Sequence, residues 1–193
     1  MSQPFDRSAT CEQPGEIDPK LGEFWVEDPF QINFENNLSS YERNRAFLNV
    51  GGKGFLEISR LTGADSDGDG RGVVAADLRG TGQLDLIVRQ SGGGPLLIFE
   101  NDFPSGNFLD VRLVGKGSNR LGIGARLVAK IGSRQLFRDQ FPVNSYRSQA
   151  ANRVHFGIGS AETVDELIIR WPSGKTQAIQ NIRSNQHLVI AEE

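Results

Sequence analysis

Three aspartates at alternate positions form the clearest group of metal-ligating side chains in the sequence. Asp65, Asp67 and Asp69 stand in the string DSDGDG, whose two glycines permit a tight loop. Ca²⁺ binds about six to eight oxygen ligands, many of them from carboxylates, so the string predicts a calcium site with Asp77 as a fourth candidate ligand. A loop whose aspartates accept backbone N–H groups has the same composition, and this second interpretation stays open.

A second group of polar side chains, in the C-terminal half, has the chemistry of a ligand-binding site. It combines hydrogen-bond donors, an aromatic ring and a titratable imidazole, a mixture that suits a sugar, carboxylate or peptide ligand. The candidate residues are Arg120, Arg126, Tyr146, Arg147, Ser148, Gln149 and His155. A purely structural interpretation is also open, in which Ser148 and Gln149 tie a bulged strand to its neighbour and His155 bonds a backbone carbonyl at the core edge.

The sequence contains none of the common catalytic motifs. There is no G-x-S-x-G string, no phosphate-binding lysine loop and no H-E-x-x-H string. Two histidines, His155 and His187, and one cysteine, Cys11, are too few for a zinc site built from several His or Cys ligands within one chain. We therefore assign no catalytic residue, and whether the protein is an enzyme stays open.

The segments that must position these side chains are short apolar runs separated by glycine-rich turns. This pattern is typical of an all-β protein. The expected strands are 46–50, 55–59, 72–77, 84–89, 96–100, 108–114, 125–131, 134–141, 154–157, 166–171, 176–179 and 188–191. We expect little helix, with a turn or short helix over 161–166, and we expect Trp171 to anchor the core.

Charge is distributed unevenly along the 193 residues, whose net charge is −3. Residues 1–42 carry nine acids and two bases, residues 43–109 eight and seven, and residues 110–193 seven and twelve. The bases of the last segment are scattered along the sequence, which argues against nucleic-acid binding. No stretch has the ~18 apolar residues of a membrane helix, and no signal peptide is visible at the N-terminus.

The string AADLRGTGQLDLIV, residues 75–88, resembles the FG-GAP or VCBS-type repeat of integrin-like β-propellers. The resemblance implies calcium ligands at Asp77, Arg79, Thr81 and Asp85. A guanidinium in place of a carboxylate would repel the metal ion. We therefore expect this loop to keep its turn without an ion, with Arg79 bridging Asp77 and Asp85.

Four strings in the C-terminal half resemble the ASPIC/UnbV domain, the C-terminal module of cartilage acidic protein and of bacterial homologues. They are NRLGIGARL, NSYRSQ, HFGIG and VDELIIRWPSGKTQ. The longer relatives are similar to a propeller plus a cap, but a single repeat cannot close a propeller, because each blade is buried only by its neighbours. We therefore expect the repeat to pack on an ASPIC/UnbV β-sandwich or barrel-like domain.

These resemblances divide the chain into three expected parts. Residues 1–40 would form an acidic arm and docking segment, residues 41–107 the FG-GAP/VCBS-like repeat, and residues 108–193 the ASPIC/UnbV domain. The exposed strand edges of a lone blade also give a reason for pairing with a second copy of the chain.

Two functions are compatible with the sequence. The first is a non-catalytic recognition or adhesion module that binds a glycan or protein partner, with any calcium structural and an extracellular or cell-envelope location by family analogy. The alternative is a calcium-assisted enzyme that acts on a small natural product or glycan. Its pocket would be lined by Arg126, Tyr146, Gln149 and His155, and finding these side chains in one cavity would favour it.

Overall fold

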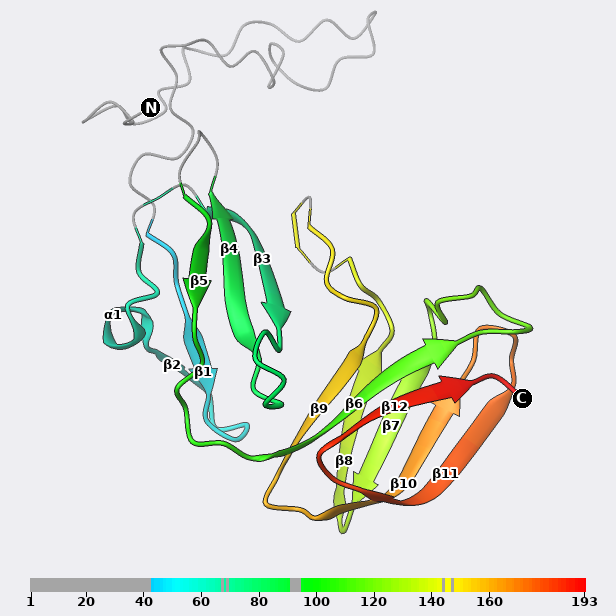
Figure 1. Ribbon diagram of the computed structural model, residues 1–193. Helices are drawn as coiled ribbons and strands as arrows, with labels where there is room; N and C mark the ends of the chain where they lie inside the picture. Colours follow the sequence, from blue (N-terminus) through cyan, green and yellow to red (C-terminus); the bar gives the residue numbers. More distant parts are fainter. Residues whose placement is uncertain (1–42, 67, 69, 91–94, 144, 147) are drawn as a thin grey trace, which may run out of the picture. The chain divides into compact units, whose positions relative to one another are not determined.

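Nearly all of the regular secondary structure in the described part of the protein is β-strand (Figure 1). The computed structural model describes residues 43–66, 68, 70–90, 95–143, 145–146 and 148–193. The expected arm over 1–40 lies outside these residues. Twelve strands and one short helix occur in the described part of the chain, so the expected all-β class is confirmed. No helix in that part is long and apolar enough to cross a membrane.

The strands follow one another along the chain with short connections. Their bounds, with that of the helix, are β1 (Phe47–Asn49), β2 (Phe55–Glu57), α1 (Ser59–Thr62), β3 (Gly70–Ala76), β4 (Asp85–Gln90), β5 (Leu97–Phe99), β6 (Asn107–Val114), β7 (Arg126–Ile131), β8 (Arg134–Asp139), β9 (Val154–Gly159), β10 (Thr163–Arg170), β11 (Thr176–Arg183) and β12 (Gln186–Ala191). Each of the twelve expected strands overlaps one of these. The alternation of apolar and polar residues and the glycine-rich turns therefore located the strands correctly.

The chain divides into two compact units. Of the described residues, those up to Gly70 belong to the first unit together with Gln90 and Pro95, and the others belong to the second. In the first unit, β1 and β2 form an antiparallel hairpin, and α1 follows it. We expected the second strand to continue through Ser59. The helix begins there instead, because the Ser59 hydroxyl accepts the N–H of Ala46 at 2.7 Å and its own N–H donates to Glu57, outside the strand ladder.

A β-sandwich forms the main core of the second unit. One sheet has the strand order β11-β10-β7-β8 and the other β12-β6-β9, and β12 runs parallel to β6. Both sheets contribute to a single apolar cluster. Its largest fully buried members are Phe156, Leu109, Leu113, Leu127, Ile158, Leu167 and Ile169. Trp171 is 3 % exposed in this cluster, so its expected place in the core is confirmed.

For residues 161–166 the helical alternative is wrong, and a turn at 160–162 leads into a strand instead. Strand β10 begins at Thr163, and Val164 pairs with Ile182 of β11 while Leu167 pairs with Ile179. Val164 and Leu167 are both completely buried although they are three residues apart, a spacing that also occurs on one face of a helix. Pairing with β11 buries both side chains in the core, and tertiary packing therefore decides against the helix.

A smaller sheet of order β3-β4-β5 precedes the sandwich in the chain. The loop between β3 and β4 contacts β6 directly. A Cβ atom built on Gly82 would lie 2.0 Å from the ring of Phe108, so the glycine backbone lies against that ring. The contact places the loop beside the end of the β12-β6-β9 sheet at which β6 begins.

Candidate ligand-binding site

A cavity of about 680 Å³ lies in the second unit where the β3–β4 loop meets the sheet β12-β6-β9. This volume falls within the range of small-molecule sites, roughly 300–1,000 Å³. The lining residues are Gly80, Thr81, Ser105, Gly106, Asn107, Phe108, Gly159, Ser160, Asn185 and His187. They come from four separate segments of the chain, and folding therefore creates a site that no single segment contains.

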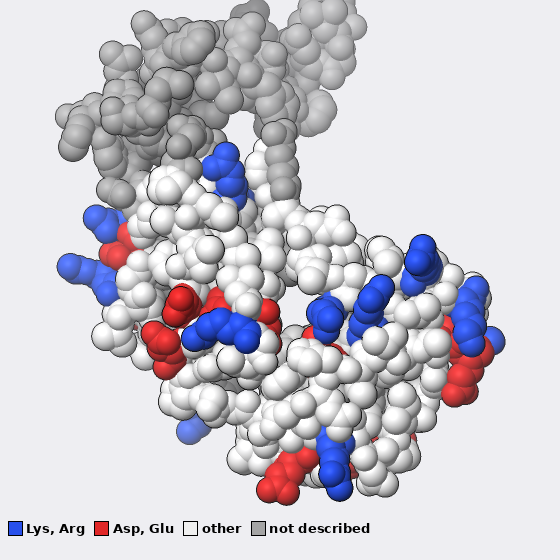
Figure 2. Space-filling view, in the orientation of Figure 1, with Lys and Arg blue, Asp and Glu red and all other residues white. Residues whose placement is uncertain are grey.

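The lining is polar but carries no Asp, Glu, Lys or Arg side chain. On the face drawn in Figure 2, by contrast, Lys and Arg side chains lie near one another over the second unit, in keeping with the basic balance of residues 110–193. Hydroxyl and amide groups line the cavity together with three glycines, whose backbone is open to a ligand. The single titratable side chain of the lining is His187.

The two amide side chains of the cavity are held in place by hydrogen bonds. Nδ2 of Asn185 donates to Oδ1 of Asn107 at 2.9 Å, and Nδ2 of Asn107 donates to the carbonyl of Ala161 at 3.0 Å. Oδ1 of Asn185 accepts the N–H of Phe108. Asn185 has a φ of 57° in the turn between β11 and β12, a conformation that asparagine tolerates better than most residues. Each amide keeps one N–H beyond these bonds that can donate to a ligand.

His187 is oriented by a buried carboxylate. Its Nδ1 lies 2.8 Å from Oδ2 of Asp110, and Nη1 of Arg153 lies 2.5 Å from the same oxygen. The Asp110 side chain is 8 % exposed, and its Oδ1 has no hydrogen-bond partner among the described residues. The Asp110 carboxylate and the Arg153 guanidinium therefore hold the ring of His187 with Nδ1 toward Asp110.

The second histidine lies on the same sheet, across Asp110. Pairing aligns His187 with Asp110 on one side and His155 with Asp110 on the other. The ring of Phe108 stacks on His155 with centroids 5.9 Å apart and meets His187 at 5.3 Å. Burial lowers the pKa of His155, and the charge of Asp110 offsets this in part, so the ring is neutral at pH 7.

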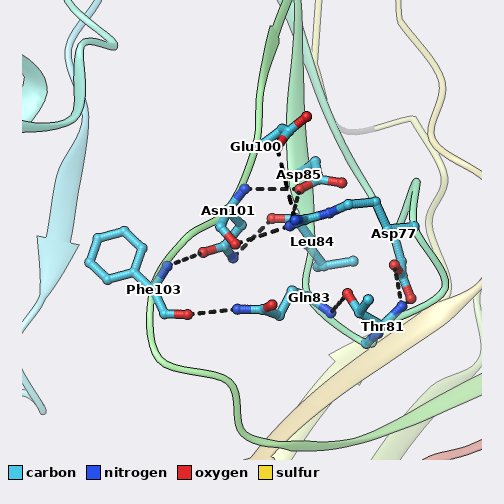
Figure 3. A network of polar contacts seen from close by, with 10 residues as sticks. Asp77, Thr81, Gln83, Leu84, Asp85, Glu100, Asn101 and Phe103 are labelled. Atoms are coloured by element: carbon cyan, nitrogen blue, oxygen red, sulfur yellow. Dashed lines mark hydrogen bonds and ion pairs between the residues drawn. The ribbon is translucent and has the colours of Figure 1, made fainter.

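The β3–β4 loop forms one wall of the cavity through Gly80 and Thr81. Figure 3 shows Asp77 and Thr81 of this loop, with Asp85 at the start of β4. Asp77 accepts the N–H groups of Thr81 and Gly82 at 3.0 and 2.7 Å. Arg79 donates to Oδ1 of Asp85 at 3.1 Å, and so the expected bridge forms at its Asp85 end. At Asp77, the other end of the expected bridge, the carboxylate binds backbone N–H groups in place of the Arg79 guanidinium.

Hydrogen bonds lower the pKa of both carboxyl groups in this loop. At Asp85 the bond from the N–H of Asn101 acts first, burial opposes it, and the charge of Arg79 adds to it. At Asp77 burial opposes ionisation, but the backbone N–H groups around the turn outweigh it. Both aspartates are therefore ionised at neutral pH and hold the turn.

The family comparison covers much of this site. Residues 115–193 match the family model described as ASPIC and UnbV. No curated protein matches the chain. The ASPIC/UnbV segment contains β7 to β12 and contributes Gly159, Ser160, Asn185 and His187 to the cavity. Phe108, Thr81 and the rest of the lining precede the match, and the resemblance of that part to an FG-GAP repeat stays a prediction.

None of the ligand-binding residues expected from the sequence lines the cavity. Arg126, at the start of the strand β7, makes a two-bond ion pair with Asp139, at 2.7 and 3.0 Å, on the surface of the ASPIC/UnbV segment. Arg120 is exposed in the preceding loop, where its carbonyl accepts the N–H of Gly115. His155 is half-buried against Phe108, and its carbonyl accepts a bond from Arg138. The structure thus gives Arg126 and His155 separate partners.

The NSYRSQ string of the ASPIC/UnbV segment is only partly described. Ser145 and Ser148 form an isolated β-bridge, and the Ser145 hydroxyl accepts the N–H of Val73 at 3.0 Å. Tyr146 and Gln149 are exposed, and Arg147 lies outside the described residues. The Ser148 hydroxyl is buried without a hydrogen-bond partner in the part of the chain that the structure covers.

The expected calcium ligands are divided between described and undescribed residues. Asp65 pairs with Arg43 at 3.0 Å, and Asp77 holds the turn above. Asp67 and Asp69 lie outside the described residues. Within the described ranges no three His, Cys, Asp or Glu side chains gather as a metal-binding group.

Three cavity residues that we did not predict from the sequence are His187, Asn185 and Asn107. Their association depends on the parallel pairing of β12 with β6, whose partners are 77 positions apart in the chain, as in the pair of His187 with Asp110. Nothing local in the sequence reveals that pairing. The one local indication was the Ser184-Asn185 pair before the last strand, because these residue types are typical of a turn.

Proposed function

We propose that this protein is a non-catalytic recognition module that binds a neutral glycan in the 680 Å³ cavity. One observation supports this above the others: the lining combines hydroxyl, amide, backbone and imidazole groups and has no fixed charge. A sugar presents many hydroxyl groups and no charge of its own. Each hydroxyl needs donors and acceptors, and such a lining supplies both.

The alternative ligand classes fit the lining less well. An anionic ligand would leave water without a Lys or Arg side chain in the lining to compensate its charge, and a cationic ligand would lack an Asp or Glu. A protein partner is expected to bury larger aromatic and Arg anchors than this concave polar surface offers. Glycan binding also agrees with the extracellular or cell-envelope location that forms part of this proposal.

A glycan array tests the proposal directly. The full chain is applied to an array of neutral and acidic oligosaccharides, together with the variants Ser160→Trp and Ser133→Trp. Ser160 is an exposed lining residue, and an indole there fills the cavity. Ser133 is an exposed residue of the β7–β8 turn and serves as the matched control.

We expect the chain and Ser133→Trp to bind neutral oligosaccharides and Ser160→Trp to lose at least about tenfold in affinity, which corresponds to ~1.4 kcal/mol. Equal binding by Ser160→Trp would place the ligand elsewhere. Binding to acidic oligosaccharides alone, or to none, would contradict the proposal and direct attention to a protein partner.

A further inference from the structure

We infer that the guanidinium of Arg79 takes the place of a metal ion in the β3–β4 loop, so that this wall of the cavity is held without calcium. The resemblance of the loop to a calcium-binding repeat implies ligands at Asp77, Arg79, Thr81 and Asp85. The residues present do not fit that ion. The reason lies in the partners that the two carboxylates already have.

Both carboxylate oxygens of Asp77 are already engaged by the backbone of the turn. One carboxylate oxygen accepts the N–H of Thr81 at 3.0 Å, and the other accepts the N–H of Gly82 at 2.7 Å. These bonds close the turn at its glycines, Gly80 and Gly82, which both have a positive φ. A bound cation would have to share or displace both of these N–H groups, and the turn would then open.

Asp85 is the more buried of the two carboxylates, with 1 % of its side chain exposed. Its Oδ1 accepts the N–H of Asn101 at 2.9 Å and Nη2 of Arg79 at 3.1 Å. Its Oδ2 is the one oxygen of the pair without a hydrogen-bond partner among the described residues. Calcium takes about six to eight oxygen ligands, and one remaining oxygen beside a guanidinium cannot supply them.

Arg79 joins the segments that a metal ion would otherwise join. The same Nη2 that bonds Asp85 also donates to the carbonyl of Asn101 at 3.1 Å, and Nη1 lies 4.0 Å from Glu100 (Figure 3). A guanidinium has five N–H donors in one fixed plane and keeps its charge at all physiological pH values. It therefore ties the β3–β4 loop to the end of β5 as a cation built into the chain.

Arg79 also affects the wall of the cavity. Gly80 and Thr81 follow Arg79 directly and line the cavity, and Gly82 lies against Phe108. The position of this wall therefore depends on Arg79 and not on the calcium concentration. The inference goes beyond the proposed function and does not need it, because it concerns how the loop is held.

The test compares the thermal stability of the full chain in calcium with its stability in a chelator. All proteins carry Asp67→Ala, so that the Asp65–Asp69 string cannot contribute a calcium response. Thermal melting is measured in calcium and in EDTA for this parent, for Arg79→Met and for Arg134→Met. Arg134 is an exposed residue of β8 and is the matched control. Amide NMR spectra of the parent follow Thr81, Gly82 and Asn101 during a calcium titration.

We expect the three amides not to shift with calcium and the Tm of the parent to be the same in calcium and EDTA. Arg79→Met is expected to lower the Tm equally in both, whereas Arg134→Met leaves it unchanged. Saturable calcium shifts of these amides in the parent would overturn the inference. A Tm of Arg79→Met equal to that of the parent would overturn it as well. The NMR titration needs only the parent protein and so remains decisive if Arg79→Met does not fold.

Discussion

Glu192 shows how a single buried carboxylate can organise several loops. The residue is completely buried directly after β12. It accepts the N–H groups of Lys116 and Ser118 at 2.8 and 2.7 Å and the hydroxyls of Ser118 and Ser173. Burial opposes ionisation, but these bonds outweigh it and lower the pKa of Glu192 to about 2. The C-terminal end of the last strand is thereby tied to two loops of the ASPIC/UnbV segment.

Glu192→Gln should lower the Tm at pH 7, because an amide cannot accept all four bonds. The pKa of the folded state is depressed, so the stabilisation is complete above the ordinary value of 4.5 and is lost as the pH falls toward 2. The difference in Tm between the wild type and the variant should therefore shrink between these two values. Calorimetric melts over this range measure it, with the exposed Glu162→Gln as control. A constant difference would contradict the assigned pKa.

The lowered pKa of His155 can be tested at higher pH, between about 5 and 7.5. Burial lowers its pKa below the ordinary 6.5, so protons bind the unfolded chain more readily than the folded one. The free energy of unfolding should therefore fall as the pH drops through 6.5 toward the lower folded value. His155→Gln should remove this part of the fall. Urea denaturation of both proteins at about pH 7.5 and 5 measures the change, and an equal fall in both would show that His155 titrates normally.

At the scale of elements, the β3–β4 loop and β6 depend on a contact that only glycine permits. Gly82 has a φ of 82°, and a Cβ atom there would lie 2.0 Å from the Phe108 ring. Gly80, two residues earlier, has a φ of 70° and no heavy atom within 4 Å of such a Cβ. The two positions therefore share backbone strain on substitution and differ in the steric clash.

Gly82→Ala should lose about 1–3 kcal/mol more of the free energy of unfolding than Gly80→Ala, because overpacking forces the Phe108 ring to move. Urea denaturation at pH 7 measures both variants. Gly82→Ala should also weaken ligand binding, since the ring that moves lines the cavity. If both variants lose the same free energy of unfolding, backbone strain alone explains the losses, and Gly82 is not packed tightly against Phe108 of β6.

The strands could be predicted from the sequence, but the site they build could not. Alternation such as Leu109, Val111 and Leu113 is a local property, and it located β6 correctly. The pairing of His187 with Asp110 joins residues 77 positions apart and leaves no local pattern. Arg126, which we predicted to bind a ligand, does not line the cavity. It pairs with Asp139 across the β7–β8 ladder, and residue type and charge alone do not reveal that partner.

At the scale of the molecule, the buried apolar side chains of the described residues are concentrated in the sandwich of the second unit. The apolar cluster draws on both sheets, and its buried members lie between Leu109 and Ile190. Leu167 occupies the middle of this cluster, where it pairs with Ala129 of β7 and Ile179 of β11. The ASPIC/UnbV segment together with β6 therefore supplies the rigid support on which the cavity depends.

Leu167→Ala should lower the free energy of unfolding by about 2–5 kcal/mol, because it leaves a cavity between the two sheets. The adjacent Ile168→Ala, on the less buried face of the same strand, should cost clearly less. Denaturation followed by circular dichroism measures both. Similar losses in the two variants would contradict the assignment of the core.

Whether a neutral glycan binds in the cavity can be tested directly by mapping the chemical shifts of the protein's amides. The full chain, labelled with nitrogen-15, is titrated with the neutral oligosaccharide that binds most strongly on the array. We expect saturable shifts at the cavity amides of Gly106, Gly159, Ser160 and Asn185. Shifts confined to the surroundings of Arg126 and Gln149, or no shifts at all, would contradict glycan binding in this cavity.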